Sequence, residues 1–380
     1  MKIIVAPDSF KGSLTAVEAA KAMEAGIKDY DSTIETVLLP AADGGEGTMS
    51  SLVGATDGRL VTVFVQDPLG RQIEASYGIL GDEETCVIEI AEASGLMLLN
   101  ENELNPLQAS SFGTGELIFH ALEAGYRKFI IGLGGSATND GGAGMLKALG
   151  MKLLDQNGVE LSPGGGSLGN LQAIDSTGFD KRVSESSFII ACDVENPFVG
   201  PKGASAVFGP QKGATAEMIE LLDANLTKFA NVVEKLNGNS LHAKKGAGAA
   251  GGAGGTFQAF FPCEMKQGIS VVLKAISFDE HLQKADLVLT GEGKTDVQTL
   301  SGKTPFGIAQ VAKREGKKVI LISGALDEKS RVQLAPFFTE LHAIADETVS
   351  AEDSMKQAYR YLRLKTKQTI ENYFAGDCCS

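Results

Sequence analysis

Two Gly-Lys-Thr triplets lie nine residues apart in the stretch GEGKTDVQTLSGKTPFG, residues 291–307. Gly-Lys-Thr ends the phosphate-binding P-loop, but that motif also requires a glycine five residues before the Gly-Lys pair. Val288 and Val297 occupy those two positions, so neither triplet completes a P-loop. The stretch nevertheless combines two lysines with two carboxylates, Glu292 and Asp296, and this combination needs another explanation.

Glycine-rich polar loops follow many of the strands that we predict. The chain has 46 glycines among 380 residues, above the usual share of ~7%. The loops are DSFKGS (8–13), ADGGEG (42–47), TGEGKTD (290–296), SGAL (323–326), GGSATNDGGAG (134–144), CDVENPFVGPKGA (192–204) and FGPQKG (208–213). Backbone amides in such loops bind anions, lysines neutralise phosphate and carboxylates bind Mg²⁺. The combination predicts phosphoryl transfer, in which positioning and charge neutralisation supply most of the catalysis.

The two ends of the chain show the pattern of a parallel α/β sheet. Apolar runs at 2–6 and 35–40 are each followed by a loop and a predicted helix, the first opened by a Thr15/Glu18 capping box. The pattern returns in three later runs, 285–290, 317–323 and 341–345. The chain therefore begins and ends in the same type of fold.

The middle of the chain has a different pattern. Residues 60–80 alternate around a Pro-Gly turn, as in an antiparallel hairpin, and TCVIEIA adds a third strand. Further strands are predicted at 129–133 and 187–191, with a long helix at 215–237. We predict an α/β protein in which a discontinuous Rossmann-like parallel-sheet domain (1–62 plus 284–380) contains a large inserted α/β domain (63–283) with an antiparallel or mixed sheet. The active site is expected in the cleft between them.

Composition excludes several classes of function. The net charge of −14 argues against a nucleic-acid partner, and no apolar segment approaches the ~20 residues that cross a bilayer. Five scattered cysteines fit a reducing compartment, and the N-terminal run is too short for a signal peptide. We expect a cytoplasmic protein with small-molecule partners, and its oligomeric state is left open.

GLGGSA, residues 132–137, favours a different function, the binding of a dinucleotide. It matches the dinucleotide fingerprint Gly-x-Gly-x-x-Ala, follows a predicted strand and has Asp155 some eighteen residues later. An NAD-dependent oxidoreductase built on Gly132, Gly134 and Asp155 is therefore an alternative. Against it, the polar loop continues through Asn139 and Asp140, where a helix should already have begun. A non-catalytic protein that binds anions through the same loops is a second alternative.

Many segments in order resemble the class I glycerate kinase family. They are APDSFKGSLTA (6–16), PAADGGEGT (40–48), DPLGR (67–71), SSFGTGELI (110–118), GLGGSATNDGGAG (132–144), CDVENP (192–197), FGPQKGA (208–214), GAGAAGG (246–252) and TGEGKTDVQTLSGKTPFGIA (290–309). The resemblance covers essentially the whole chain. It implies an ATP- and Mg²⁺-dependent kinase that phosphorylates D-glycerate to 2-phosphoglycerate, and it assigns the twin triplets to a family-specific loop.

Phosphorylation of an alcohol needs a group to accept its proton. Asp193 is the first candidate for this base because it follows a buried-looking strand and has no lysine nearby in sequence; a turn-stabilising Asp is the alternative. Asp8 is the second candidate, although it can also be a helix cap. Lys11 and Lys303 are expected to neutralise the transferring phosphate, with ordinary surface lysines as the alternative.

The remaining candidates bind ligands. Asp43 and Glu46 are predicted Mg²⁺ ligands, and Glu292 and Asp296 are the competing pair. Arg71 is expected to hold the carboxylate of glycerate through paired hydrogen bonds. Further substrate-binding candidates are Ser9, Thr114, Gly115, Asn196 and Lys212. Candidates for nucleotide binding are Gly134, Gly135, Ser136, Asn139, Asp140, Gly291 and Lys294.

Overall fold

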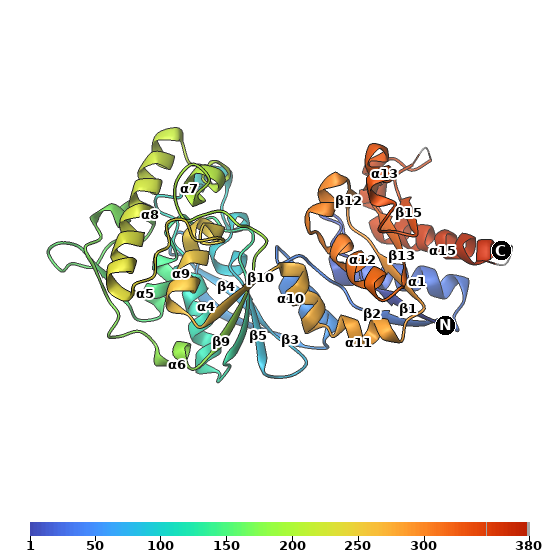
Figure 1. The fold of residues 1–380 in the computed structure, drawn as a ribbon, viewed down its shortest axis with the longest axis horizontal. Coiled ribbons are helices and arrows are strands. Elements are labelled where there is room, and N and C mark those ends of the chain that lie inside the picture. The colour runs from blue at the N-terminus through green and yellow to red at the C-terminus, as the bar shows by residue number, and fades with distance from the viewer. Residues whose placement is uncertain (347, 378–380) are drawn as a thin grey trace. The chain divides into compact units, whose positions relative to one another are not determined.

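The computed structural model describes residues 1–346 and 348–377. Residue contacts divide the chain into two compact units: the first contains residues 1–43, 50–57 and 269 onward, and the second contains 44–49 and 58–268. Figure 1 draws the first unit in blue and in orange to red, because it is built from the two ends of the chain. Cys378 and Cys379 lie outside the described residues.

The first unit contains a five-stranded parallel sheet in the order β2-β1-β11-β13-β15. Its strands are β1 (Lys2–Val5), β2 (Glu35–Leu38), β11 (Leu287–Thr290), β13 (Lys318–Ser323) and β15 (Glu340–Ala343). All five were predicted from the sequence, and they are confirmed. The strand order reverses between β1 and β11, and ligands in open parallel sheets bind outside the carboxyl ends of the strands at such a point.

Helices and short elements complete the first unit. They are α1 (Ala16–Tyr30), α2 (Thr48–Ala55), α10 (Gly268–Ala275), α11 (Phe278–Gln283), β12 (Lys294–Thr295), the 3₁₀ helix η6 (Val297–Ser301), α12 (Thr304–Arg314), β14 (Ala325–Leu326), η7 (Glu328–Ser330), α13 (Arg331–Leu334), α14 (Ala351–Lys356) and α15 (Ala358–Asp377). The predicted capping box at Thr15 and Glu18 is confirmed. Residues 269–283, assigned to the inserted domain from the sequence, group with this unit. Ile269 packs so closely on Gly307 of α12 that a Cβ at Gly307 would come within 2.4 Å of it.

Helices α1 and α15 join the two ends of the chain (Figure 1). They approach closely at Gly26, where a Cβ would lie 2.4 Å from the carbonyl oxygen of Arg363. Arg363 also pairs with Asp29 at 2.6 Å. The core beneath them consists of apolar side chains from α1, the central strands and α15, among them Ile3, Met23, Leu289 and Leu362. Burial of these side chains fixes the sheet that carries the loops described below.

The second unit contains a six-stranded mixed sheet in the order β10-β9-β6-β5-β4-β3. Its strands are β3 (Arg59–Gln66), β4 (Gln72–Ile79), β5 (Thr85–Glu89), β6 (Lys128–Gly132), β9 (Ser187–Ala191) and β10 (Cys263–Lys266). The predicted antiparallel hairpin is confirmed as β3 and β4, whereas β5, β6, β9 and β10 are parallel. The predicted mixed sheet is therefore present.

The other elements of the second unit cover this sheet or extend from it. They are α3 (Ala91–Ser94), η1 (Leu96–Leu98), η2 (Glu101–Glu103), α4 (Phe112–Glu123), α5 (Ala143–Ala148), β7 (Lys152–Leu154), η3 (Gly165–Asn170), β8 (Ala173–Asp175), α6 (Lys181–Ser184), α7 (Ala204–Phe208), η4 (Pro210–Lys212), α8 (Ala216–Asn237), η5 (Ala249–Gly252) and α9 (Ala253–Phe260). The long helix predicted at 215–237 is α8. Within the described part of the chain, no helix is long and apolar enough to cross a membrane.

Candidate active site

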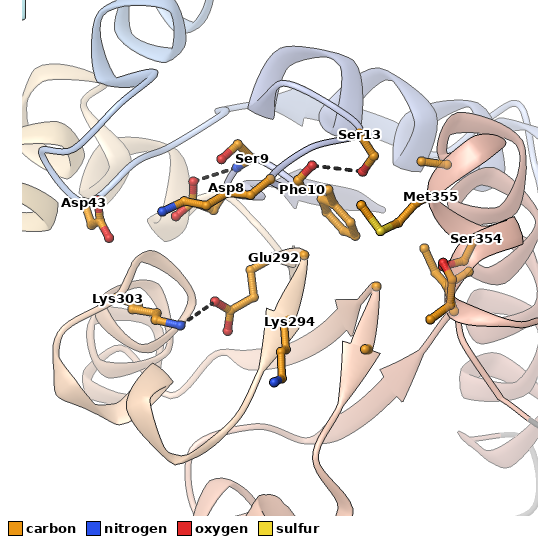
Figure 2. A pocket seen from close by; sticks show the side chains of 17 residues that line it. Asp8, Ser9, Phe10, Ser13, Asp43, Glu292, Lys294, Lys303, Ser354 and Met355 are labelled. Carbon is orange, nitrogen blue, oxygen red and sulfur yellow. Dashed lines mark hydrogen bonds and ion pairs between the residues drawn. The ribbon is translucent and has the colours of Figure 1, made fainter. Parts of the chain in front are cut away.

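A pocket of about 340 Å³ lies at the carboxyl edge of the parallel sheet in the first unit. The segments that follow β1, β2, β11, β13 and β15 line it, together with residues of α14 and the start of α15. Six of its lining residues are charged: Asp8, Asp43, Glu292, Lys11, Lys294 and Lys303. Figure 2 labels all of these except Lys11. Three carboxylates and three ammonium groups thus share one pocket at the point where the strand order reverses.

Hydrogen bonds between the β1 and β11 strand ends place Asp8 beside Glu292. Asp8 N–H donates to the carbonyl oxygen of Gly291 at 2.8 Å, directly beyond the last paired residues of the two strands. Thr290 reinforces this edge, since its hydroxyl donates to the carbonyl oxygen of Ala6 at 2.8 Å. Gly291 is required here, because a Cβ would come within 2.2 Å of the carbonyl oxygen of Ile322.

The Asp8 carboxylate is held in a fixed orientation. It accepts hydrogen bonds from the Thr304 hydroxyl and from Ser9 N–H, both at 2.6 Å. Burial, and to a smaller extent the negative charges of Asp43 and Glu292, raises the pKa of Asp8 to about 6 despite these two hydrogen bonds. A carboxylate with a pKa near neutrality and a fixed orientation can act as a general base.

Glu292 is almost fully buried and forms a small polar cluster. The hydroxyls of Thr295 and Thr299 donate to its Oε1 at 3.0 and 2.6 Å, and Lys303 Nζ lies 3.6 Å from its Oε2. Burial raises the pKa of Glu292, and the hydrogen bond from Thr299 and the charge of Lys303 oppose that shift. The carboxylate therefore restrains Lys303, whose side chain remains about one third exposed.

Oxygen donors in the pocket suit a hard cation. Asp43 and Glu292 both line it, whereas Asp296 caps η6 by accepting a hydrogen bond from Gln298 N–H at 2.8 Å, and Glu46 belongs to the second unit. Among residues 1–346 and 348–377, no three His, Cys, Asp or Glu side chains gather as a complete metal site. Mg²⁺ needs only one or two protein carboxylates, because it keeps water and phosphate oxygens as its other ligands. The donor set therefore fits Mg²⁺ bound together with a phosphate ligand.

In the second unit, the glycine-rich loop after β6 is held by buried hydrogen bonds. The Asp140 carboxylate accepts from Ser111 N–H and hydroxyl, at 2.8 and 2.9 Å, and from the amides of Gly142 and Gly144. Asn139 donates to the Ser205 hydroxyl at 2.9 Å. Asp140 and Asn139 thus fix the loop from inside.

The dinucleotide-binding alternative lacks support from this loop. The helix that the fingerprint requires begins only at Ala143, after the whole loop has passed. Asp155 closes a turn by accepting from the amides of Asn157 and Val159 at 2.7 and 2.9 Å. Neither feature provides the helix N-terminus and the acidic ribose contact on which that alternative depends.

Lys212, a predicted substrate-binding residue, is buried rather than exposed in its loop. Only 2% of the residue is exposed, and its Nζ donates to the carbonyl oxygen of Thr138 at 2.6 Å. Burial lowers the pKa of Lys212 to about 7, and Asp140 partly opposes this shift. Lys212 therefore supports the loop after β6 through a backbone contact.

Lys212 should make stability dependent on pH. Above pH 7 the folded protein loses this proton, whereas the unfolded chain keeps it up to about pH 10.4. The free energy of unfolding should therefore rise between pH 7 and 10, by at most about 1.4 kcal/mol per pH unit from this group. In urea titrations, the difference between wild type and Lys212→Met should show this slope. The exposed control Lys245→Met should show none, and a flat difference curve for Lys212→Met would contradict the assignment.

Arg71 and Thr114, two further candidates in the second unit, differ in their exposure to solvent. Arg71 pairs with Asp67 at 2.5 Å and with Glu103 at 2.6 Å, and half of its side chain is exposed. Thr114 is buried and shares a hydrogen bond with Ser94.

Gly115, Asp193 and Asn196 have structural contacts. A Cβ at Gly115 would come within 2.6 Å of Ala148, so this glycine lets α4 and α5 pack closely. Asp193 accepts from Gly268 N–H at 3.2 Å, and Asn196 donates to the carbonyl oxygen of Lys202 at 2.8 Å.

The structure brings one group of the predicted site residues together in the pocket of the first unit: Asp8, Ser9, Lys11, Asp43, Glu292, Lys294 and Lys303. Gly291 supports that pocket from behind, and Asp296 caps the neighbouring η6. Another group lies in the second unit: Glu46, Arg71, Thr114, Gly115, Gly134, Gly135, Ser136, Asn139, Asp140, Asp193, Asn196 and Lys212.

Sequence reasoning missed Thr304 and Glu89. Thr304 directly follows a selected lysine and opens α12, so its position beside Lys303 and before Pro305 was a usable signal. Glu89 ends an otherwise apolar strand and accepts from the amides of Met49 and Gly47, at 2.6 and 3.3 Å. Burial raises the pKa of Glu89 to about 7. A charged residue in the last position of a buried strand was the available signal.

Comparisons with known proteins agree on one family. The sequence profile of the glycerate kinase family matches residues 3–373. The chain is 49% identical to glycerate kinase of Bacillus subtilis (strain 168) over 362 residues, which cover 95% of each chain. It is also 49% identical to glycerate 2-kinase of Escherichia coli (strain K12) over 328 residues, 86% of each chain. A crystal structure assigned to glycerate kinase 2 of Salmonella typhimurium LT2 matches with a TM-score of 0.90 at 45% identity, over 99% of each chain.

Proposed function

The chain belongs to the glycerate kinase family, and we propose that it transfers the γ-phosphoryl group of ATP to D-glycerate, with 2-phosphoglycerate and ADP as products. The observation that carries this proposal is the pocket of the first unit, where three carboxylates and three lysines meet at the reversal of strand order. Phosphoryl transfer requires both cations beside the phosphate oxygens and a carboxylate beside the attacking alcohol.

We assign the three pocket lysines to the triphosphate. Lys11 and Lys294 are exposed on the wall, and Lys303 is restrained at its inner side by Glu292. Lysine binds phosphate as a point charge, so three ammonium groups in one pocket can neutralise much of the charge of ATP. Restraint of Lys303 by a buried carboxylate means that less side-chain freedom is lost when phosphate binds.

We assign the base to Asp8, with Asp193 as the other candidate. Asp8 lines the same pocket as the lysines, and two hydrogen bonds fix its carboxylate. It can accept the proton of the glycerate hydroxyl as that oxygen attacks phosphorus. Asp193 is exposed and accepts a hydrogen bond from Gly268 N–H. Geometry within the described pocket favours Asp8, and the Asn variants of both residues separate the two assignments.

Mg²⁺ would be held by Asp43, with Glu292 as the second pocket carboxylate. When bound, the ion withdraws charge from the phosphate oxygens. The residues of this chain then keep the nucleotide and the base in fixed positions. Three further assignments stay predictions: the ligand-binding roles of Glu46, Asp296 and Arg71, the binding of nucleotide by the amides of the loop after β6, and the cytoplasmic location.

Release of ADP coupled to D-glycerate tests the proposed function. We expect purified protein with ATP, Mg²⁺ and D-glycerate to form ADP, and ³¹P NMR of the product to show the resonance of 2-phosphoglycerate. Omission of glycerate should abolish ADP release. Formation of 3-phosphoglycerate would correct the position of phosphorylation, whereas absence of glycerate-dependent ADP release would refute the proposal.

A further inference from the structure

The pocket of the first unit has two chemically different ends. Figure 2 shows Asp43 and Lys303 on one side and Met355 and Ser354 on the other, with Glu292 between them. The charged side carries the carboxylates and lysines of the pocket. We call the other side the apolar end, and it is formed by Phe10, Ala325, Ile344, Met355 and Ala358.

We propose that the apolar end binds the adenine base of the nucleotide, in contact with Met355. This inference rests on the proposed function and adds to it the subsite for the base. The triphosphate would then extend toward Lys303 within the same pocket.

The chemistry of the apolar end excludes glycerate as its natural occupant. Every carbon of glycerate carries oxygen, so glycerate offers no apolar face to pack against Met355, which is 53% exposed, beside Phe10 and Ile344. Adenine is a flat ring with apolar faces, and it is the part of ATP that gains from leaving water. The volume of about 340 Å³ also lies at the lower end of the ~300–1,000 Å³ range typical for drug-sized ligands. A three-carbon acid would leave most of it unfilled.

Met355 is suited to contact a ring. It lies on α14, its side chain is exposed, and it reaches over the loop after β1: a Cβ at Gly12 would lie 3.3 Å from its methyl carbon. The methionine thioether is flexible and makes favourable contacts with aromatic rings. Gly12 has a positive φ of 78° and no side chain, so it leaves Met355 room beside the pocket.

The order of the strands also favours a nucleotide that binds with its phosphates at the charged end and its base at the apolar end. The charged residues Asp8 and Glu292 follow β1 and β11, where the strand order reverses. Ala325 and Ile344 follow β13 and β15, which lie farther toward the edge of the sheet. A nucleotide with its phosphates at the reversal would therefore direct its base toward β13 and β15 along the carboxyl edge.

Binding measurements on Met355 variants test the inference without requiring turnover. Met355→Glu should weaken ADP binding about tenfold, because the charged side chain would have to be buried against the ring. Binding of inorganic tripolyphosphate, which has no base, should be the same as in wild type. Met355→Leu should bind ADP nearly as wild type does. Met97→Glu is the matched control, since Met97 is 87% exposed and belongs to the second unit.

Several outcomes would overturn the inference. If Met355→Glu weakened the binding of ADP and of tripolyphosphate equally, the new charge would be acting on the phosphates. Unchanged ADP binding would show that Met355 does not contact the base. In kinetic assays, a raised KM for D-glycerate with an unchanged KM for ATP would place the acid in the apolar end. Absence of turnover in wild type would refute the proposed function, while the binding measurements would still decide the site of the base.

Discussion

Replacement of Asp8 by Asn is expected to lower kcat for glycerate phosphorylation by about 10²- to 10⁴-fold, the range typical for loss of a general base. Asn keeps the size of the side chain and can still accept a hydrogen bond from Thr304, which donates to Asp8 at 2.6 Å. The amide nevertheless cannot accept the proton of the glycerate hydroxyl. Because the base acts after binding, the KM for ATP should change little.

Steady-state kinetics of Asp8→Asn and Asp193→Asn, measured side by side, check this expectation. Asp279→Asn is the control, because Asp279 is exposed on α11 of the same unit. Near-normal turnover of Asp8→Asn together with a collapse in Asp193→Asn would transfer the role of base to Asp193. Near-normal turnover of both variants would require another base.

Replacement of Lys303 by Met should lower kcat/KM for ATP by about 10²-fold or more, as losses of single preorganised charge-stabilising groups do. Two effects combine in this variant. The triphosphate loses a cation, and the buried Glu292 carboxylate loses the ammonium group that lies 3.6 Å away. An unpaired buried carboxylate costs stability, so the melting temperature should also fall.

The double variant Lys303→Met/Glu292→Gln separates these two effects. The neutral amide at 292 no longer needs an ammonium partner, so the double variant should recover stability relative to Lys303→Met. Activity should not recover, because the cation beside phosphate is still missing and a candidate Mg²⁺ ligand has also been neutralised; the single variant Glu292→Gln measures the second effect alone. Recovery of activity in the double variant would show that Lys303 acts only as the partner of Glu292.

Much of the first unit could be predicted from the sequence. The runs KIIV, LVLT and KVILIS are continuously apolar, since parallel strands covered on both faces need no polar alternation. The capping box of α1 is also a local signal, because it involves only Thr15 and Glu18. Each of these signals lies within one element, and the structure confirms each element.

The order of the strands could not be predicted in the same way. β1 pairs with β11, whose residues lie 284 positions later in the chain, and local patterns contain no information on such long-range pairing. The short strand β10 was also missed: CEMK is half polar, and it forms a strand only because the preceding strand β9 pairs with it.

The charged residues that line the pocket could be selected from the sequence by their type, whereas their hydrogen-bond partners could not. Asp8, Glu292 and Lys303 were selected because they are charged residues in glycine-rich loops. The place of Thr304 between Lys303 and Pro305 marked it as the start of a helix, but its contact with Asp8 is visible only once the two loops are placed together. Lys212 was selected as a substrate-binding residue because it too is a charged residue in such a loop, and its burial against the carbonyl oxygen of Thr138 has no local signal in the sequence.

A crystal structure of the protein with Mg²⁺ and a non-hydrolysable ATP analogue would show where the nucleotide binds. We expect triphosphate density beside Lys303 and Asp8, and adenine against Met355 and Ile344 in the pocket of the first unit. Nucleotide density at the loop after β6, with only solvent in this pocket, would refute the assignment of the pocket to ATP.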